Sequence, residues 1–383
     1  MKAVRFCVYV ACAAAVLLLV VFAVRTDRTY LDLHESIKNR IESLFTNLPG
    51  DSFIRQGYHN YLRATNRRHI NRVTFLTDGR LMMDTPESTV FLEERAAGFA
   101  ELDSFLETRQ TPLIYVRIPS KIENNSVLPT AFSDNKIVEH GDRFIQLISE
   151  HGIDTLDLYA EMIRESKDFA TAFFLKDIHW TAETALWASG KIGAHLNMEY
   201  NFGIDESIWN TERYDRITYR NAFLGNEATF ASARRAYEDI TVLIPKFDAE
   251  FDFAGESIGV WKSGSFIDVF APKVQNDYNE RFDYMDQSVP EAPFLTIINE
   301  SAGNNKKVLL IAESNGLVLC PIFSLGFQRL DFVYLITGLT PTIIWDILKA
   351  NEYDAVILAV SDAVVSLDDK AYFEEDRLFL GNP

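Results

Sequence analysis

The most informative pair of reactive side chains lies in the run Asp177-Ile178-His179-Trp180. An aspartate and a histidine this close can supply the orienting carboxylate and the general base that a serine nucleophile needs, because a serine hydroxyl reacts poorly at neutral pH without them. The next residue, Thr181, is a suitable cap for a helix over 181–196. The alternative, a structural histidine beside a surface aspartate, stays open on this pair alone.

Two serines compete to be the nucleophile that this pair would serve. Ser314 lies between an apolar strand at 308–311 and an apolar helix at 315–326. The carboxyl end of a parallel strand is where open α/β sheets bind ligands, and a helix start supplies N–H groups for a developing oxyanion. Ser52 stands in a Gly-Asp-Ser block, but it follows Asn47-Leu48-Pro49, where no strand is evident. We therefore favour Ser314.

A third serine, Ser257, fits the Gly-x-Ser-x-Gly pattern of the α/β-hydrolase nucleophile elbow at 255–259. That family places its histidine after the serine, whereas the last histidine here is His195. A turn-like run rather than a helix follows, so we expect a loop. The sequence has no P-loop, Gly-x-Gly-x-x-Gly, His-Glu-x-x-His or cysteine pairs at zinc spacing, which argues against sites built on those motifs.

Alternating strands and helices must position these side chains, and such alternation implies crossover units and a mainly parallel sheet. The expected strands cover 113–118, 155–158, 308–311, 332–336 and 355–360, and the expected helices cover 91–108, 140–152, 181–196, 315–326 and 342–350. Residues 200–305 break the rhythm. They are rich in Asp, Asn, Gly and aromatic residues and look like an irregular insertion with short strands.

Residues 1–24 form a separate segment. Lys2 and Arg5 precede an uncharged stretch over 6–24, which is about long enough to cross a hydrocarbon core as a helix. The basic residues favour a cytoplasmic N-terminus and an extracytoplasmic location for the rest. We expect an uncleaved signal anchor, single-pass in the cell membrane, followed by a helical stalk over 25–50 and the main domain over 51–383. A cleaved signal peptide is the alternative.

The chain is strongly acidic, with 37 Lys and Arg against 55 Asp and Glu and a formal net charge of −18. Nucleic acid and anionic lipid headgroups repel such a chain, so we expect no nucleic-acid partner. Cys320 is the single cysteine after residue 24, and its apolar neighbours indicate a buried thiol.

Taken in order, these motifs carry a resemblance. The run at 177–180 followed by a helix, and later a strand and an acidic-serine turn, resembles SGNH-hydrolase-like proteins of the AlgX/AlgJ alginate O-acetyltransferase type, and is closest to the bacterial DHHW family. Further runs resemble that family's other elements, and the first of them makes Ser52 part of a different element: Asp51-Ser52-Phe53-Ile54-Arg55, Ile118-Pro119-Ser120-Lys121, Phe223-Leu224-Gly225-Asn226 and Val242-Leu243-Ile244-Pro245-Lys246-Phe247.

The resemblance implies an SGNH-like (flavodoxin-like) α/β fold, with a mainly parallel sheet and helices on both faces. It also implies a triad of Ser314 as nucleophile, His179 as base and Asp177 as orienting carboxylate, which converge at the carboxyl edge of the sheet. A serine mechanism of this kind needs no metal and no organic cofactor.

Five further residues are weaker candidates for contacts with the substrate or the oxyanion. Lys121 and Asp362 follow strands at the carboxyl edge, and Gly225 would lend a backbone donor. Tyr284 and Asn299 precede the serine strand at a spacing similar to the family's. A solvated lysine, a turn glycine and core aromatics are the plain alternatives.

The sequence departs from the family pattern at two places. Ile178 stands where the DHHW name has histidine, and Ala312-Glu313-Ser314 stands where Gly-Asp-Ser or Gly-Thr-Ser is usual. Glu313 keeps the negative charge, but Ala312 is expected to crowd the turn. Because of these two departures, the alternative that this protein is a catalytically inactive relative stays open.

The resulting interpretation is a membrane-anchored, extracytoplasmic serine O-acyl transferase or esterase. It would move or remove an acetyl group on a cell-surface or secreted polysaccharide. The implied partners are the polysaccharide, an acyl donor, which includes the case of a membrane acyltransferase, and the membrane itself through the N-terminal helix. The alternative is a non-catalytic SGNH-like binding or scaffold protein of a polysaccharide export or modification complex.

Overall fold

The computed structural model describes residues 69–70, 72–83, 91–129, 135–231, 237–275, 284–335 and 341–367. The expected anchor over 6–24, the expected stalk over 25–50 and Ser52 lie outside the described residues. Within the described ranges, no helix is long and apolar enough to cross a membrane.

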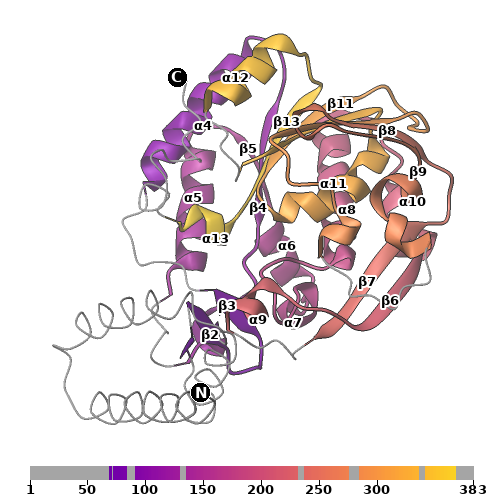
Figure 1. Ribbon diagram of the computed structural model, residues 1–383. Helices are drawn as coiled ribbons and strands as arrows, with labels where there is room; N and C mark the ends of the chain where they lie inside the picture. Colours follow the sequence, from indigo (N-terminus) through magenta and orange to yellow (C-terminus); the bar gives the residue numbers. More distant parts are fainter. Residues whose placement is uncertain are drawn as a thin grey trace, which may run out of the picture. The chain divides into compact units, whose positions relative to one another are not determined.

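An eight-stranded sheet forms the centre of the described chain (Figure 1). Its strand order is β5-β4-β13-β11-β12-β10-β8-β9, in which the first five strands run parallel and the last three pair antiparallel. The strands are β4 (Leu113–Ile118), β5 (Asp154–Asp157), β8 (Glu250–Gly255), β9 (Val260–Ser265), β10 (Phe294–Asn299), β11 (Lys307–Ala312), β12 (Arg329–Tyr334) and β13 (Ala355–Ser361). The predicted α/β fold with a mainly parallel sheet is confirmed.

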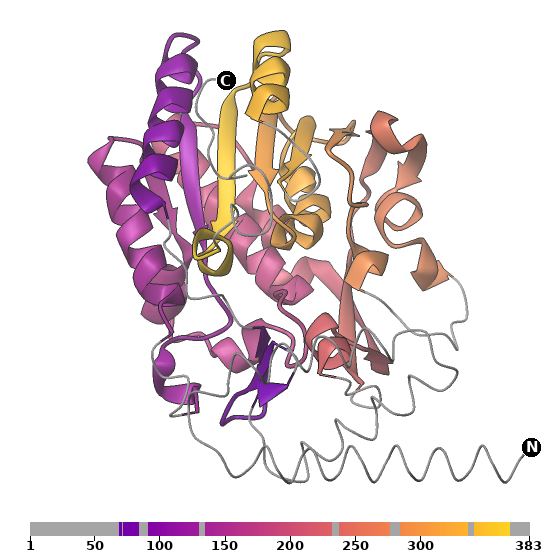
Figure 2. The same ribbon diagram turned by 60° about the vertical axis from the view of Figure 1, so that its left-hand side comes forward.

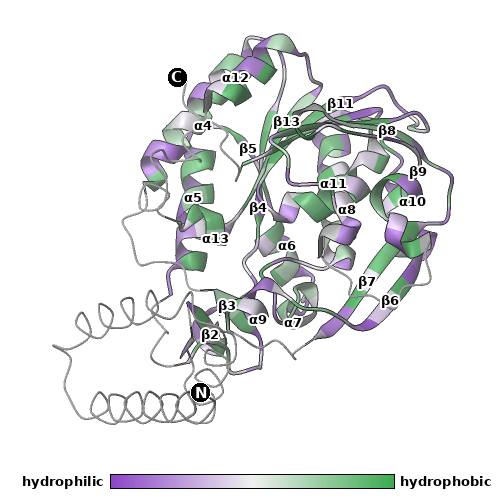
Figure 3. Ribbon diagram, in the orientation of Figure 1, coloured by the Kyte–Doolittle hydropathy of each residue, from purple (hydrophilic) through white to green (hydrophobic). Residues whose placement is uncertain are grey.

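Strands β4, β11 and β13 have the composition that a doubly covered parallel strand requires. Every residue of β4 and β13 is buried, as is every residue of β11 after Lys307. Parallel strands are covered on both faces and therefore read as continuous apolar runs rather than as an alternating pattern. Figure 3 shows these central strands in the hydrophobic colour.

Helices cover both faces of the sheet, as Figures 1 and 2 show from two directions. On one face, α4 (Leu92–Glu107), α5 (Ile137–Glu150) and α12 (Pro341–Ala350) pack on one set of strand residues, including Leu309 and Ile311. On the other face, the helices pack on the alternate set, including Leu310 and Ala312, and are α6 (Leu158–Arg164), α7 (Phe169–Ala172), α8 (Ala182–Tyr200), α10 (Phe266–Phe270) and α11 (Asn315–Phe323).

The order of the parallel strands is a permuted flavodoxin order. Counted from β11 through β12, β13, β4 and β5, the strands lie in the order 2-1-3-4-5, although β4 and β5 come first along the chain. In that topology the switch point lies between the first and third strands, here β11 and β13, and ligands bind at the carboxyl ends beside it. Ser314 follows β11 and therefore lies at this point.

Residues 200–305 are more regular than their composition predicts. They contain a two-stranded sheet of β6 (Tyr214–Phe223) and β7 (Glu238–Pro245), the short helix α9 (Asn226–Phe230), and three strands that extend the main sheet. In β8, Phe251 and Phe253 are buried while Asp252 is exposed, so one face packs on the core and the other meets solvent. That alternation places polar residues inside strands, which made the region look irregular.

The remaining elements are short. Ser257 lies in a 3-10 helix, η6 (Glu256–Ile258), in the connection from β8 to β9, so its Gly-x-Ser-x-Gly run is a hairpin loop as expected. The other short elements are β1 (His69–Ile70), β2 (Val73–Phe75), β3 (Leu81–Met83), α13 (Asp362–Val365), η2 (Asn125–Val127), η4 (Glu206–Trp209), η5 (Thr211–Arg213), η7 (Pro272–Gln275), η8 (Tyr284–Gln287) and η9 (Ser324–Gly326).

Candidate active site

The aspartate–histidine pair lies in a tight loop before α8. His179 Nδ1 lies 2.5 Å from Asp177 Oδ1, and the His179 backbone N–H donates to the same oxygen at 3.1 Å. The second carboxylate oxygen accepts the Asn226 backbone N–H at 2.6 Å. Both side chains are buried, and the Thr181 hydroxyl caps α8 by accepting from the Thr184 N–H. The loop therefore presents the histidine in one fixed orientation.

The serine turn is closed by the residue before it. The Ser314 hydroxyl donates to Glu313 Oε2 at 3.0 Å, and the Asn315 backbone N–H donates to the same oxygen at 3.1 Å. The Asn315 side-chain amide donates to Glu313 Oε1 at 2.9 Å. Glu313 and Ser314 are buried, and Ser314 immediately precedes α11 in helical backbone conformation. The acidic residue thus fixes the geometry of the strand-to-helix turn.

Trp180 and Asn315 join the two segments. The Trp180 backbone N–H donates to Asn315 Oδ1 at 3.1 Å, and its indole N–H donates to the Asn315 carbonyl at 3.0 Å. These residues directly follow His179 and Ser314, and Trp180 is fully buried. The structure therefore joins the segment that carries the predicted base to the segment that carries the predicted nucleophile. Their catalytic roles stay predictions.

Carboxylates dominate the electrostatics around His179. Burial opposes its charged form, but the carboxylates of Asp177, Glu313 and Glu227 outweigh burial and raise the pKa of His179. Burial also opposes the charge of Asp177, yet the His179 ring and the Asn226 N–H lower the pKa of the Asp177 carboxyl. The pair is thus arranged to carry an imidazolium beside a carboxylate, which is the state that follows proton abstraction from a serine.

Two N–H groups that the sequence assigned to an oxyanion site are used inside the turn. The Asn315 N–H donates to the Glu313 carboxylate, and the Gly316 N–H donates to the Glu313 carbonyl at 2.8 Å. An oxyanion donor must point at the position of the developing charge. These two N–H groups are engaged by Glu313 in this arrangement of the turn, and the expected oxyanion role of the helix start stays a prediction.

Ala312 does not crowd the turn, contrary to expectation. A Cβ atom placed on Gly316 would lie 2.5 Å from the Ala312 Cβ, so the absent side chain at 316 leaves the space that the Ala312 methyl occupies. Ile178, the second departure, has an exposed side chain with 37% of its surface accessible. Its side chain therefore faces solvent rather than the Asp177–His179 contact.

Gly225 packs against the aspartate loop. A Cβ atom there would lie 2.0 Å from the Lys176 carbonyl oxygen, so only glycine permits this approach. It directly precedes α9, whose Asn226 N–H reaches Asp177. The structure thus gives Gly225 a positioning task beside the site, while its predicted oxyanion role stays a prediction.

Lys121 is buried, so the alternative of a solvated surface lysine is wrong. Its ammonium donates to Glu227 Oε2 at 2.6 Å and to the Asp177 carbonyl at 2.7 Å. Asp362 lies on the same edge, fully buried, and accepts from Arg117 Nε at 2.7 Å. Burial raises the pKa of Asp362 to about 7, although Arg117 opposes the shift. Both residues are engaged in ion pairs within the protein.

Asn299 lies away from the predicted triad. It ends β10 beside the start of β12, where its N–H donates to the Gln328 carbonyl, so it stands at the amino edge of the parallel strands. Its amide donates to the Leu325 carbonyl at 3.2 Å. The structure therefore does not support its predicted contact with substrate. Tyr284 begins η8, and its side chain lies outside the described part of the molecule.

Sequence reasoning missed two residues of this site, Glu227 and Asn315. Glu227 is fully buried, and its Oε1 atom accepts the Met83 backbone N–H at 2.7 Å. Its position two residues after Gly225 was the available signal, although a glutamate in a polar run usually indicates a solvated surface. Asn315 follows Ser314 directly at the start of an apolar helix. A buried amide needs hydrogen-bond partners, and this requirement was the available signal for a contact with another segment.

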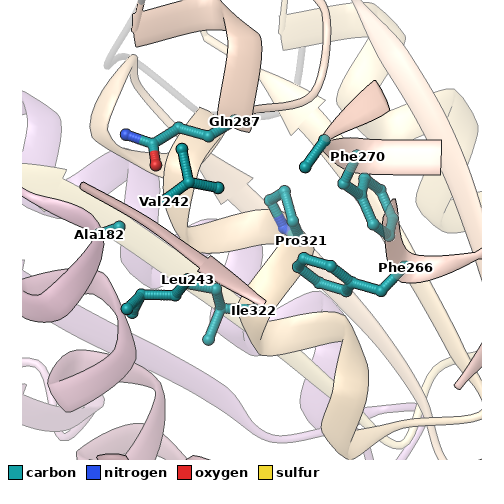
Figure 4. Close-up of a pocket in the computed structure, with 9 residues that line it drawn as sticks. Ala182, Val242, Leu243, Phe266, Phe270, Gln287, Pro321 and Ile322 are labelled. Carbon is teal, nitrogen blue, oxygen red and sulfur yellow. The ribbon is translucent and has the colours of Figure 1, made fainter. Parts of the chain in front are cut away.

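A separate pocket lies between β7, α8, α10 and α11, and Figure 4 shows the side chains that line it. Its lining is Ala182, Val242, Leu243, Phe266, Phe270, Ala271, Gln287, Pro321 and Ile322. The Gln287 amide is buried, and neither of its polar atoms has a hydrogen-bond partner in the described ranges. None of the three predicted triad residues lines this pocket.

Comparison with known proteins agrees with the resemblance seen in the sequence. Residues 75–216 match the family model described as "SGNH hydrolase-like domain, acetyltransferase AlgX". This range contains Lys121, Asp177 and His179, whereas Ser314 lies beyond it. No curated protein sequence matches the chain.

Two solved structures share the fold. Bacillus cereus PatB1 with a sulfonyl adduct superposes with a TM-score of 0.63 at 14% identity, over 81% of this chain and 97% of that one. A DHHW family protein from Eubacterium siraeum superposes with a TM-score of 0.56 at 14% identity, over 79% of this chain and 94% of that one. The resemblance to SGNH-hydrolase-like proteins of the AlgX type is thereby confirmed.

Proposed function

We propose that this protein is an SGNH-type serine O-acyl transferase or esterase, with acetyl as the group transferred. One observation carries the proposal: the segments of the predicted base and nucleophile are joined by the two hydrogen bonds between Trp180 and Asn315. In addition, His179 faces Asp177 through Nδ1, which is the ring nitrogen that the orienting carboxylate contacts in a serine triad.

The proposed chemistry proceeds in two balanced steps. Ser314 Oγ attacks the acyl carbonyl carbon, its proton passes to His179 Nε2, and the leaving oxygen takes that proton as the acyl-enzyme forms. A sugar hydroxyl or water then gives a proton to His179 and attacks the acyl-enzyme, and Ser314 Oγ leaves with the proton returned from the imidazolium. Asp177 holds the ring and stabilises its positive charge in both steps.

The proposed substrate is a polysaccharide, in keeping with the match to the acetyltransferase AlgX model. We also propose that the uncharged stretch over 6–24 anchors the protein in the cell membrane and that the rest is extracytoplasmic. Protease treatment of intact cells should digest residues 30–383. Protection of that region would contradict this topology.

The alternative is a non-catalytic binding or scaffold protein, and one observation favours it. Glu313 engages the first N–H groups of α11, which the oxyanion would otherwise use. The two functions differ in whether Ser314 forms a covalent adduct with an acyl donor.

Turnover of acetyl esters, including an acetylated polysaccharide, tests the proposal. With the full-length protein, Ser314→Ala should lower the rate by several orders of magnitude, as the loss of a nucleophile does. Ser52→Ala should leave the rate within about twofold, because most substitutions away from a site are near neutral. The reverse pattern would move the nucleophile to residue 52, and equal activity in both variants would favour the scaffold function.

A further inference from the structure

The backbone of the loop that carries Asp177 is held by a buried ammonium group. Lys121 lies just beyond β4 and is 5% exposed. Its Nζ atom donates to the Asp177 carbonyl at 2.7 Å, to the Leu175 carbonyl at 3.4 Å and to Glu227 Oε2 at 2.6 Å. These three contacts use all three donors of the ammonium. Lys121, which follows β4, thus ties the 175–177 loop to the end of that strand.

Helix α9 forms hydrogen bonds to the same loop. Its first two residues act together, because the Asn226 N–H reaches the Asp177 carboxylate while Glu227 holds Lys121. The Ala228 N–H then donates to the Lys176 carbonyl at 3.1 Å. Glu227 is itself fixed by the Met83 N–H on β3. Helix α9 therefore contacts the Asp177 carboxylate directly, and it reaches the Asp177 carbonyl only indirectly, through the ion pair of Glu227 with Lys121.

A buried charge pair is an unusual way to hold a loop. Desolvation of two ions is costly, so buried ion pairs often add little stability compared with apolar residues of similar size. Here the ammonium supplies donors to carbonyls that the loop does not satisfy itself, and the glutamate neutralises it. The arrangement also places a third carboxylate near the histidine, after Asp177 and Glu313, with Lys121 as the neighbouring cation.

We propose that Lys121 and Glu227 form a positioning pair that sets the orientation of Asp177 and, through it, of His179. The inference rests on the proposed function, because orientation of the base matters only if His179 takes a proton from Ser314. This role replaces the substrate contact expected of Lys121 from the sequence, because its ammonium is used by Glu227 and by two backbone carbonyls. The misplacement of a base by about 1 Å can slow a reaction by up to about a hundredfold.

Glu227→Gln is the principal test because it keeps the shape and an acceptor oxygen while it removes the charge. In full-length protein, NMR titration of the imidazole should show that His179 loses its proton at lower pH than in the wild type. Acylation of Ser314 by p-nitrophenyl acetate, followed by mass spectrometry, should slow about ten- to a hundredfold. Because loss of the Glu227 charge alone lowers the His179 pKa, the acylation rates are compared at a pH at which His179 is neutral in both proteins. A bystander charge would leave that rate unchanged.

Lys121→Met leaves the buried Glu227 carboxylate without its cation, which can cause misfolding. The double variant Lys121→Met/Glu227→Gln is therefore measured as well, because it removes both charges. Asp331→Asn is the matched control: Asp331 is fully buried, pairs with Arg329 at 2.8 Å and lies in register with Leu309, well before the serine turn. It should leave the His179 titration and the acylation rate unchanged.

The proposal is overturned if folded Glu227→Gln and double variants keep the His179 titration and an acylation rate within twofold of the wild type. It is also overturned if Asp331→Asn causes the same changes. If wild-type Ser314 accepts no acyl group, the proposed function fails. The NMR signal of the proton between His179 Nδ1 and Asp177 still decides whether the pair controls the Asp177–His179 contact, because it needs no turnover.

Discussion

Helix α8 has an aspartate–histidine pair near each end, and the two pairs differ in ways that matter for chemistry. At its start, His179 contacts Asp177 through Nδ1. Near its end, His195 contacts Asp154 Oδ2 through Nε2 at 2.7 Å, and the Tyr200 hydroxyl donates to the same oxygen. Asp154 begins β5, so the second pair lies at the amino edge of the parallel strands.

The two pairs also differ in solvent exposure and in the segments that they connect. The His179 and Asp177 side chains are 7% and 2% exposed, whereas those of His195 and Asp154 are 12% and 28% exposed. The first pair is joined to the serine turn through Trp180 and Asn315. The second pair links the end of α8 to β5. The comparison teaches that an aspartate–histidine pair alone does not indicate a base. The ring nitrogen in contact with the carboxylate and the edge of the sheet are what favour His179 as the predicted base.

The largest expected effect separates the two aspartates. Asp177→Asn should slow acylation of Ser314 by roughly a thousandfold or more, because the amide no longer selects the tautomer or stabilises the imidazolium. Asp154→Asn should change that rate by less than about twofold. Burst kinetics with p-nitrophenyl acetate measure both rates, and equal losses in the two variants would break the comparison.

Two glycines sharpen the comparison through stability. Gly225→Ala forces a Cβ to within 2.0 Å of the Lys176 carbonyl, so we expect a loss of about 1–3 kcal/mol together with slower acylation. Gly190, within α8, would place its Cβ no closer than 3.6 Å to Trp209. Gly190→Ala should stabilise the protein by about 0.5–1 kcal/mol through helix propensity. Urea unfolding measures both, and a neutral Gly225→Ala would contradict the close packing of α9 on the loop.

The raised pKa of His179 predicts how activity depends on pH. Burial opposes the charge, but Asp177, Glu313 and Glu227 raise this pKa, and only the neutral ring can accept the serine proton. The acylation rate should therefore fall as the pH drops through the raised pKa. Glu313→Gln removes one of these carboxylates, so the acidic limb should move to lower pH.

The matched control for that shift lies at the other pair. Glu199 contributes to the raised pKa of His195, at the other end of α8 from His179. Glu199→Gln should leave the acidic limb of the rate profile unchanged. A shift of equal size would mean that long-range charge rather than the serine turn sets the profile.

The smallest expected effect concerns stability at the second pair. The Asp154 hydrogen bond raises the pKa of His195, although burial opposes it, so protonated His195 stabilises the fold. That contribution is fully present below the pKa of an unfolded histidine and is lost as the pH rises through the folded value. The melting temperature of the wild type should therefore fall more between pH 6 and pH 9 than that of His195→Gln. Identical curves would show that the pair contributes nothing.

Local patterns in the sequence were sufficient for the parallel part of the fold and for the turn after β11. The runs at 113–118, apart from Arg117, and at 355–360 are apolar because both faces are covered, and Ser314 stands between an apolar strand and a helix. The three antiparallel strands were obscured, since a strand such as β8 alternates the charged residues Glu250 and Asp252 with buried aromatic residues. The segments of the predicted triad meet through the hydrogen bonds of Trp180 to Asn315, a contact between distant parts of the chain that local patterns do not reveal.

The positioning contacts could not be read from the sequence. Lys121 and Glu227 are far apart along the chain, and each type of residue is usually solvated when seen alone. The space that Gly316 leaves for Ala312 likewise depends on how the helix leaves the strand, so the departure from the family pattern looked more disruptive than it is. Asn299 was misplaced because spacing along the chain says nothing about which edge of the sheet β10 ends on.

The most direct test of the central claim is to identify the residue that becomes covalently modified. Full-length protein treated with phenylmethylsulfonyl fluoride should gain one sulfonyl group, which peptide mass spectrometry should locate on Ser314. The modification should slow about a thousandfold or more in His179→Ala, because the base that activates the serine is lost. A sulfonyl group on Ser52, or modification of Ser314 at the same rate without His179, would contradict the account.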